Sequence, residues 1–218
     1  MLVSPSILTC DFAHLEQELL FVKQSGADMV HLDVMDGVFV PNMSFGPPVI
    51  AGFRPVSDMF FDVHLMMEYP DRLIDAFAKA GADLINFHVE SQAPIEETLN
   101  RIHALGKKAA LTIKPKTPAS AVFPYLDKVE MVLIMTVEPG FGGQAFMADM
   151  MPKLGELRAE IKRRGLSVQL QVDGGIATAT APIAAAAGAD IAVVGSAFFN
   201  APDAAALVEE IHKLPVGE

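Results

Sequence analysis

Short apolar runs rich in β-branched residues recur along the chain, separated by longer stretches in which apolar positions follow helical spacing. The runs predict strands near residues 2–8, 29–35, 60–66, 84–89, 108–114, 131–137, 167–173 and 191–196. The stretches predict helices near 11–25, 70–80, 94–105, 149–164, 177–187 and 203–213, with two weaker helices after the second and fifth strands. The chain is therefore expected to alternate strand and helix along its length.

The tripeptide Gly-Ala-Asp begins at Gly26, Gly81 and Gly188, each time between a predicted helix and a predicted strand. Glycine suits the left-handed residue that follows a helix, and the acid then leads into the strand. The intervals fit multiples of about 27 residues, and a chain of 218 residues holds about eight such units. We predict an α/β protein, a single (βα)8 TIM barrel forming one domain over residues 1–218. An open doubly wound sheet is the alternative, but the first strand lacks the dinucleotide-binding glycine pattern after it.

Two predicted strands carry imidazole and carboxylate groups on one face and only apolar groups on the other. Side chains alternate along a strand, so His31 and Asp33 share one side, as do Asp62 and His64 thirty residues later. Asp173 ends a third apolar run. Core histidines paired with neighbouring acids would explain either strand alone. The matching placement on both strands instead favours a metal site of His31, Asp33, His64 and Asp173 at the carboxyl ends of the strands, where barrel active sites lie.

Imidazole and carboxylate ligands suit zinc, iron(II), manganese or cobalt, and the pattern leaves the choice among them open. A metal beside two carboxylates fits removal of a proton next to a carbonyl group, because the ion stabilises the enediolate that forms. Asp33 and Asp173 would face the substrate carbon from opposite sides. One would remove a proton and the other return one, which inverts the centre.

Three glycine-rich turns come late in the chain, at or just after the ends of the last three predicted strands: 138–144, Gly174-Gly175 and Gly195-Ser196. Glycine lets backbone N–H groups approach a phosphate, and helix N-termini add a favourable dipole. A phosphate site in the loops after strands seven and eight is a recurrent feature of this barrel. The turns therefore predict a phosphorylated substrate.

Six segments in chain order resemble the ribulose-phosphate 3-epimerase family: Ser4–Leu8, His31–Gly37, Phe39–Asn42, His64–Met66, Met135–Gln144 and Val172–Ile176. The resemblance spans nearly the whole chain. It implies interconversion of D-ribulose 5-phosphate and D-xylulose 5-phosphate, a step of the pentose phosphate pathway, with Asp33 and Asp173 as the acid/base pair. It implies one divalent ion per chain, Zn²⁺ first and Fe²⁺, Mn²⁺ or Co²⁺ as alternatives, held by His31, Asp33, His64 and Asp173. The substrate-binding residues it implies are Ser6, Met35, His64, Met66, Met135, Gly142, Gly143, Gly174, Gly175, Gly195 and Ser196.

Some positions depart from the family pattern. Gln171 stands where many relatives have Glu, which would alter the surroundings of the metal. Lys114 and Lys116 occupy a turn where Asn-Pro is also common, and Lys114 is expected as a solvated lysine beside the tail of the sugar. His88 faces inward without a motif of its own and is expected to be a core or neighbouring residue rather than a ligand.

The composition excludes several partners. A net charge of −11 and a pI near 4.9 disfavour nucleic acid and anionic membranes, which bind clustered basic surfaces. Signal-like and membrane-spanning apolar stretches are not apparent, and the single Cys10 suits a reducing compartment, so we expect a cytoplasmic protein. We expect a small sugar phosphate as the partner and a homo-oligomer as the assembly.

Three other functions compete with this interpretation. An epimerase of a ketohexose 6-phosphate such as D-allulose 6-phosphate would use the same metal and acids. A decarboxylase or aldehyde-lyase on this barrel is disfavoured because His64 stands where the decarboxylase relatives need Lys in an Asp-x-Lys-x-x-Asp run. A non-catalytic phosphate-binding barrel is disfavoured by the intact acids and ligands.

Overall fold

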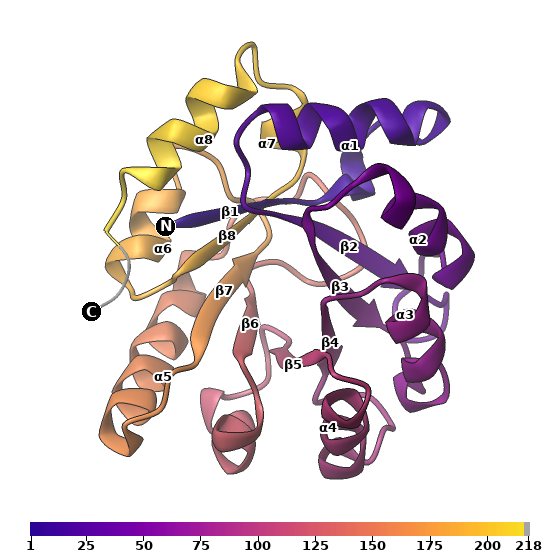
Figure 1. Ribbon diagram of the computed structural model, residues 1–218. Coiled ribbons are helices and arrows are strands. Elements are labelled where there is room, and N and C mark those ends of the chain that lie inside the picture. Colours follow the sequence, from indigo (N-terminus) through magenta and orange to yellow (C-terminus); the bar gives the residue numbers. More distant parts are fainter. Residues whose placement is uncertain (216–218) are drawn as a thin grey trace.

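The computed structural model describes residues 1–215, which form a parallel eight-stranded barrel surrounded by helices (Figure 1). The strands are β1 (Leu2–Pro5), β2 (Met29–Met35), β3 (Phe60–Met66), β4 (Leu84–His88), β5 (Lys108–Ile113), β6 (Met131–Met135), β7 (Gln169–Asp173) and β8 (Ile191–Val194). Neighbours pair in the order β1-β8-β7-β6-β5-β4-β3-β2. A bridge between Ser6 and His31, and a 3.0 Å hydrogen bond from the Asp28 N–H to the Val3 carbonyl, join β1 to β2. The predicted barrel is confirmed.

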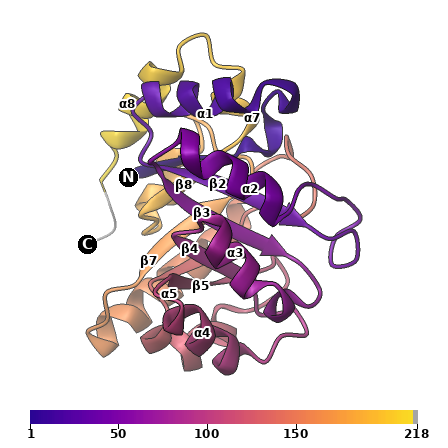
Figure 2. The same ribbon diagram turned by 45° about the vertical axis from the view of Figure 1, so that its right-hand side comes forward.

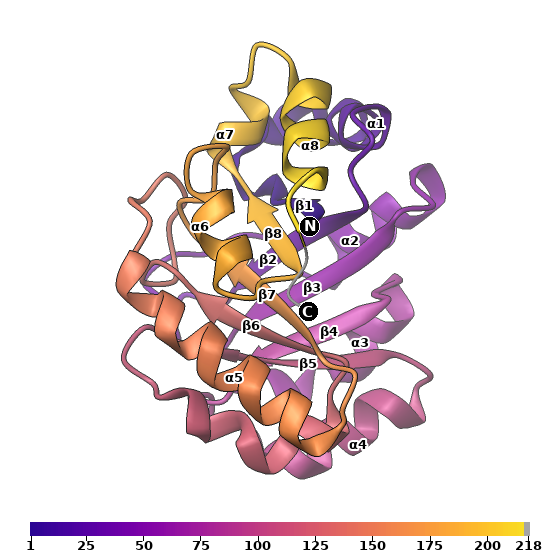
Figure 3. The same ribbon diagram turned by 90° about the vertical axis from the view of Figure 1, so that its left-hand side faces the viewer.

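Helices connect successive strands, as the apolar periodicity predicts. They are α1 (Leu15–Gln24), α2 (Pro47–Phe53), α3 (Ile74–Ala80), α4 (Ile95–Ala104), α5 (Met151–Arg164), α6 (Ala181–Ala186), α7 (Ser196–Phe199) and α8 (Ala204–His212). Short 3₁₀ turns are η1 (Ile7–Thr9), η2 (Phe12–His14), η3 (Arg54–Val56), η4 (Pro70–Arg72) and η6 (Ala148–Met150), and η5 (Ala119–Lys128) is longer. The two weak helices expected after the second and fifth strands are α2 and η5. Figure 3 shows α5 and α6 on the outer side of β7 and β8.

The first and last strands are shorter than the sequence predicts. The strand expected over 2–8 ends at Pro5, because the Ser6 hydroxyl accepts the Leu8 N–H at 3.3 Å and starts the η1 turn. The strand expected over 191–196 ends at Val194, because Gly195 begins the short helix α7, which the apolar pattern does not reveal. Both changes move backbone from a strand into the loops at the carboxyl end of the barrel.

The three Gly-Ala-Asp joints have the conformation that the sequence predicts. Gly26, Gly81 and Gly188 have φ values of +81°, +111° and +103°, in the left-handed region that glycine enters without strain. The acid after each glycine then binds the backbone of the preceding strand. The bonds run from Val3 N–H to Asp28 (2.8 Å), from Phe61 N–H to Asp83 (2.8 Å) and from Leu170 N–H to Asp190 (2.7 Å), and Ala109 N–H binds Glu130 (2.7 Å) in the same way.

This contact repeats four times around the barrel, once at each even-numbered strand. Each acid also meets a basic side chain, which comes from the segment before the odd-numbered strand in three cases and from the last helix, α8, in the fourth. The pairs are Asp28 with His212, Asp83 with Arg54, Glu130 with His103 and Asp190 with Arg158. These hydrogen bonds and ion pairs stabilise the amino-terminal end of the barrel, which lies opposite the candidate site.

The strands separate an apolar outer layer from a partly polar interior. Val30, Leu32 and Val34 of β2 point outward and are buried against the helices, whereas His31 and Asp33 point inward and are buried too. Figure 2 shows the segment between β2 and α2 extending beyond the carboxyl end of the strands. Within residues 1–215, no helix combines the length and apolar character needed to cross a membrane.

Candidate metal centre

The four side chains singled out by the strand pattern meet inside the carboxyl end of the barrel. One ligand atom from each of His31, Asp33, His64 and Asp173 lies within 4.8 Å of the other three. His64 Nδ1 is 3.0 Å from Asp33 Oδ1, and His31 Nε2 is 3.3 Å from both of those atoms. Asp173 Oδ2 is 3.9 Å from each of the two imidazole nitrogens.

These distances fit a single divalent ion. Ligand atoms at about 2.0–2.2 Å from a tetrahedral zinc are about 3.3–3.6 Å from one another. The measured separations of 3.0 to 3.9 Å bracket that range. Two imidazoles and two carboxylates that face one another in a buried space also form a donor set that such ions prefer. The group could therefore hold a divalent metal.

Further side chains fix the orientation of the ligand groups. Asp62 Oδ2 lies 2.8 Å from His31 Nδ1, on the side of the ring away from the cluster, and accepts a 2.7 Å hydrogen bond from the Gln171 amide. The Ser6 hydroxyl donates to Asp33 Oδ2 at 2.5 Å. Asp62 and Gln171 are fully buried, so water does not compete for these contacts. Gln171 is thus linked to the cluster through Asp62.

The electrostatics of the cluster favour positive charge. Burial opposes ionisation of Asp33, but the charges and hydrogen bonds of His31 and His64 hold its pKa well below the usual range. Burial, together with the charge of Asp33, raises the pKa of Asp173 to about 6. Burial also opposes the charge of His31, yet the carboxylates of Asp33 and Asp62 outweigh it and raise the His31 pKa well above its ordinary value. The two central carboxylates therefore differ in their affinity for a proton.

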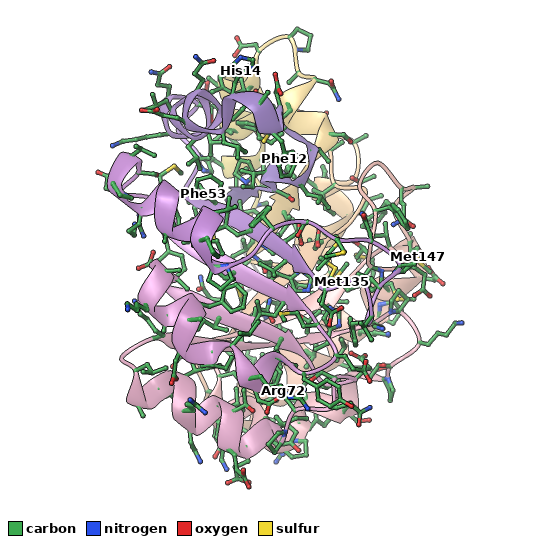
Figure 4. All side chains as sticks on the ribbon, turned by 90° about the vertical axis from the view of Figure 1, so that its right-hand side faces the viewer. Phe12, His14, Phe53, Arg72, Met135 and Met147 are labelled. Carbon is green, nitrogen blue, oxygen red and sulfur yellow. The ribbon has the colours of Figure 1, made fainter. Side chains whose placement is uncertain are left out.

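A cavity of about 220 Å³ opens above the cluster. Asp33 and Asp173 line it, while His31 and His64 lie fully buried beneath. The other predicted substrate-binding residues line the same cavity: Ser6, Met35, Met66, Met135, Gly142, Gly143, Gly174, Gly175, Gly195 and Ser196. Figure 4 shows Met135 inside the barrel and Met147 at the end where the connecting loops lie.

The turn at Gly174-Gly175 admits only glycine. Both residues have positive φ, +121° and +66°. A Cβ on Gly174 would come within 2.5 Å of Val137, and a Cβ on Gly175 would strike the backbone of Phe146. The absence of side chains lets Val137 and Phe146 pack closely against the turn, and both glycines line the cavity.

The cavity also contains residues that sequence reasoning missed. Thr9 reaches it from the turn after β1, and Ala177 and Ala197 follow the glycine turns after β7 and β8. Thr9 lies just beyond the strand predicted over 2–8, in the η1 turn that the apolar pattern does not predict. Ala177 and Ala197 carry no polar side-chain group, so their residue type gives no signal of a binding role.

His88 and Lys114, which the sequence analysis also considered, lie outside the cluster. His88 is fully buried, with its Nε2 atom 2.9 Å from His64 Nε2, so it is a neighbour of the candidate ligand group. Lys114 is half-buried, with its Nζ atom 3.5 Å from the centre of the Phe39 ring.

Fold and cluster together define an eightfold barrel with a candidate metal centre under a cavity at its carboxyl end. Residues 2–199 match the model of the ribulose-phosphate 3 epimerase family. The chain belongs to the ribulose-phosphate 3-epimerase family, and thus to the sugar-phosphate isomerases.

Curated relatives agree with this assignment. The chain is 44% identical over 210 residues to ribulose-phosphate 3-epimerase of Bacillus subtilis, which covers 96% of this chain and 97% of the relative. It is 49% identical over 198 residues to the Rhodobacter capsulatus enzyme of the same name, covering 91% and 86% of the two chains.

Solved structures of lower identity share the fold. The 3-hexulose-6-phosphate synthase of Salmonella typhimurium superposes with a TM-score of 0.70 at 18% identity, covering 98% of each chain. Phosphoribosyl anthranilate isomerase of Thermus thermophilus gives 0.69 at 15% identity, covering 97% of this chain and 96% of the other. Both likenesses show the barrel alone.

Proposed function

We propose that this protein inverts C3 of a ketose phosphate, interconverting D-ribulose 5-phosphate and D-xylulose 5-phosphate in the pentose phosphate pathway. The observation that carries the proposal is the pair of carboxylates, Asp33 and Asp173, which line one cavity from strands β2 and β7. The two relatives described above are ribulose-phosphate 3-epimerases, which supports the pentose substrate over a ketohexose 6-phosphate.

His31, Asp33, His64 and Asp173 would hold one divalent ion, with Zn²⁺ the first candidate because a tetrahedral set of imidazole and carboxylate groups suits it. Fe²⁺, Mn²⁺ and Co²⁺ accept the same donors. When bound, the ion would supply positive charge that stabilises the negative charge of an enediolate. The remaining chemistry belongs to the side chains.

Asp33 and Asp173 would act as the acid/base pair, because an inversion needs a proton removed on one face and returned on the other. The raised pKa of Asp173, about 6, and the lowered pKa of Asp33 suit a pair in which one group carries the proton while the other is ionised. Ser6 would orient Asp33 through its hydroxyl and contact substrate oxygens. Met35, Met66 and Met135 would surround the reacting carbon and exclude water.

The backbone at Gly142, Gly143, Gly174, Gly175 and Gly195, with the residue Ser196, would bind the phosphate. Their place in the cavity beside Asp33 and Asp173 supports this role, because a phosphate held there leaves the rest of the sugar over the carboxylates.

We further propose that the chain acts as one catalytic domain in the cytoplasm and assembles as a homo-oligomer. The single cysteine, suited to a reducing compartment, supports the first part. Val38 and Met43, exposed by 73% and 74%, are large apolar side chains that association of copies would cover, which supports the second.

The test is a side-by-side assay of D-ribulose 5-phosphate and D-allulose 6-phosphate with metal analysis of the same sample. We expect a higher kcat/KM for the pentose phosphate, loss of turnover after chelation and recovery when metal is returned. A higher kcat/KM for D-allulose 6-phosphate would instead identify the protein as a ketohexose-phosphate epimerase. Full activity in rigorously metal-free protein would contradict a catalytic role for a metal at the cluster.

A further inference from the structure

A chain of buried polar contacts runs outward from His64, away from the candidate metal centre. His64 Nε2 lies 2.9 Å from His88 Nε2, and the two rings stack with their centroids 5.0 Å apart. The other nitrogen of His88, Nδ1, lies 3.2 Å from Glu90 Oε2. Glu90 stands just beyond the end of β4, in the loop that follows the strand.

The second oxygen of Glu90 is held firmly. Its Oε1 atom accepts the Lys114 N–H at 2.8 Å and also the Thr117 hydroxyl. Lys114 and Thr117 belong to the loop after β5, and a residue of α5 holds this loop in place. The Lys153 ammonium donates to the carbonyls of Lys114, Pro115 and Thr117 at 3.2, 2.6 and 2.6 Å. Because two donors occupy Oε1, the carboxylate cannot turn over, and Oε2 is the atom that His88 meets.

The proposed metal site determines which group donates in each hydrogen bond between His64, His88 and Glu90. A neutral imidazole that offers Nδ1 to a metal carries its proton on Nε2. His64 Nε2–H therefore donates to His88 Nε2, so His88 carries its own proton on Nδ1 and donates it to Glu90. Burial opposes the charge of Glu90, but the contacts with His88, Thr117 and Lys114 lower its pKa to about 2, which keeps it an acceptor.

We propose that Glu90 is a positioning residue for the metal centre, which acts through His88 to keep Nδ1 of His64 unprotonated and turned toward the other ligand groups. The inference rests on the proposed metal site. On this proposal a carboxylate orients each of the two ligand histidines. Asp62 orients His31 directly, while Glu90 orients His64 through the imidazole of His88. A carboxylate that holds a ligand histidine in this way strengthens its hold on the metal.

Glu90→Gln tests the proposal, because it reverses the donor and acceptor roles along the contacts from Glu90 through His88 to His64, here called the relay, and keeps the size of the side chain. Lys114 N–H and Thr117 O–H still need an oxygen, so the new amide turns its NH₂ toward His88. His88 Nδ1 must then accept and its Nε2 must carry the proton, which opposes the proton on His64 Nε2. We expect the zinc dissociation constant, measured by competition with a chromogenic chelator, to rise about 10- to 100-fold.

Glu130→Gln is the matched control. Glu130 also contacts a histidine, His103, and accepts a backbone N–H, but at the opposite end of the barrel. It should leave zinc affinity unchanged. Wild-type affinity in Glu90→Gln would overturn the proposal, whereas failure of the wild-type protein to bind zinc would instead refute the proposed metal site.

His88→Leu separates the relay from a purely structural effect of Glu90 on its loop. With the relay cut, adding Glu90→Gln should cause little further loss of zinc affinity, so the two effects should be strongly non-additive. Full additivity would show that Glu90 acts by another route. Nitrogen-15 spectra of the histidine rings in the wild-type zinc-loaded protein give a check that needs no variant. They should place the proton of His88 on Nδ1, and a proton on Nε2 would contradict the proposal.

Discussion

The polar side chains around the cluster each use their two polar atoms for different partners. Asp33 turns Oδ1 to His31 and His64, and Oδ2 to the Ser6 hydroxyl. His31 turns Nε2 inward to the cluster and Nδ1 outward to Asp62. A side chain held at both ends has little freedom to rotate, which keeps the ligand atoms preorganised. Conservative substitutions here should therefore change chemistry more than packing.

The two carboxylates allow the sharpest test at the residue scale. Asp33→Asn and Asp173→Asn should each reduce epimerisation by about 10²–10⁴-fold or more, because each removes one acid/base group. Measured at matched metal occupancy, one variant should still exchange the C3 proton of D-ribulose 5-phosphate with deuterated solvent. The other should exchange only that of D-xylulose 5-phosphate. If one variant loses exchange from both sugars while the other epimerises normally, a single base does the work.

Asp36, just after β2, gives a prediction about pH. Burial opposes its charge, but three backbone N–H groups, of Glu68, Phe39 and Val38, hold its pKa below the usual range. A carboxyl with a lowered folded pKa stabilises the fold above its unfolded pKa, about 3.9, and loses that contribution as the pH falls toward the folded value.

Asp36→Asn should therefore lower the free energy of unfolding at pH 7 by about 1–2 kcal/mol, since the amide has one acceptor for three donors. The difference from wild type should shrink as the pH falls from 5 to 3. Denaturant titrations at several pH values measure it. Asp127→Asn, at an exposed position, is the control. If the difference in unfolding free energy between wild type and Asp36→Asn stays constant down to pH 3, the charge of Asp36 contributes nothing to stability.

At the scale of the elements, the loop after β6 is the most exposed wall of the cavity. Phe141 at its tip is 55% exposed, and Gln144 bonds the loop to itself through the carbonyls of Glu138 and Phe141. Its link to the rest of the barrel includes the Asn42 amide, which donates to Gly140 O at 2.8 Å. A loop with so few anchors is suited to closing over a bound substrate.

Valine at Gly142 and Gly143 should impair that closure. A Cβ at Gly142 would meet Thr9 at 2.6 Å, and Gly143 has a φ of +74°, which a β-branched residue adopts only under strain. We expect KM to rise and kcat to fall together, because phosphate contacts and closure are lost at once. Gly155→Val, on the exposed side of α5 with open space around it, should leave both constants unchanged. Unaltered kinetics in the loop variants would make this segment merely structural.

The sequence predicts helices and strands well where a local residue pattern determines the backbone conformation. The apolar runs locate all eight strands, and Gly26, Gly81 and Gly188 mark helix ends because left-handed backbone demands glycine. Strand parity also places His31, Asp33 and His64 on the inward face. Contacts between segments distant in sequence are not encoded in any local pattern. The bonds from Gln171 to Asp62 and from Glu90 to Thr117 depend on barrel closure and loop geometry, so the sequence alone does not reveal them.

The whole molecule gathers three carboxylates, Asp33, Asp62 and Asp173, within one largely buried region. Burying charges without compensation costs stability. The barrel withstands this cost through its large apolar layer and the four acid–strand contacts at the far end. A divalent cation would balance the cluster, so metal binding should be visible in the stability of the entire fold and not only in catalysis.

Zinc should therefore raise the melting temperature of the metal-free protein. A ligand that binds only the folded state stabilises it by about 2.7 kcal/mol at one hundred times its dissociation constant. For a chain of this length each kcal/mol shifts Tm by roughly 2–4 °C, so we expect a rise of roughly 5–11 °C in a calorimetric or fluorescence melt. Asp173→Asn removes one ligand and should greatly reduce the shift, which also controls for zinc bound at surface groups such as His14 and Asp11. Equal shifts in the variant and the wild type would place the bound zinc elsewhere on the molecule.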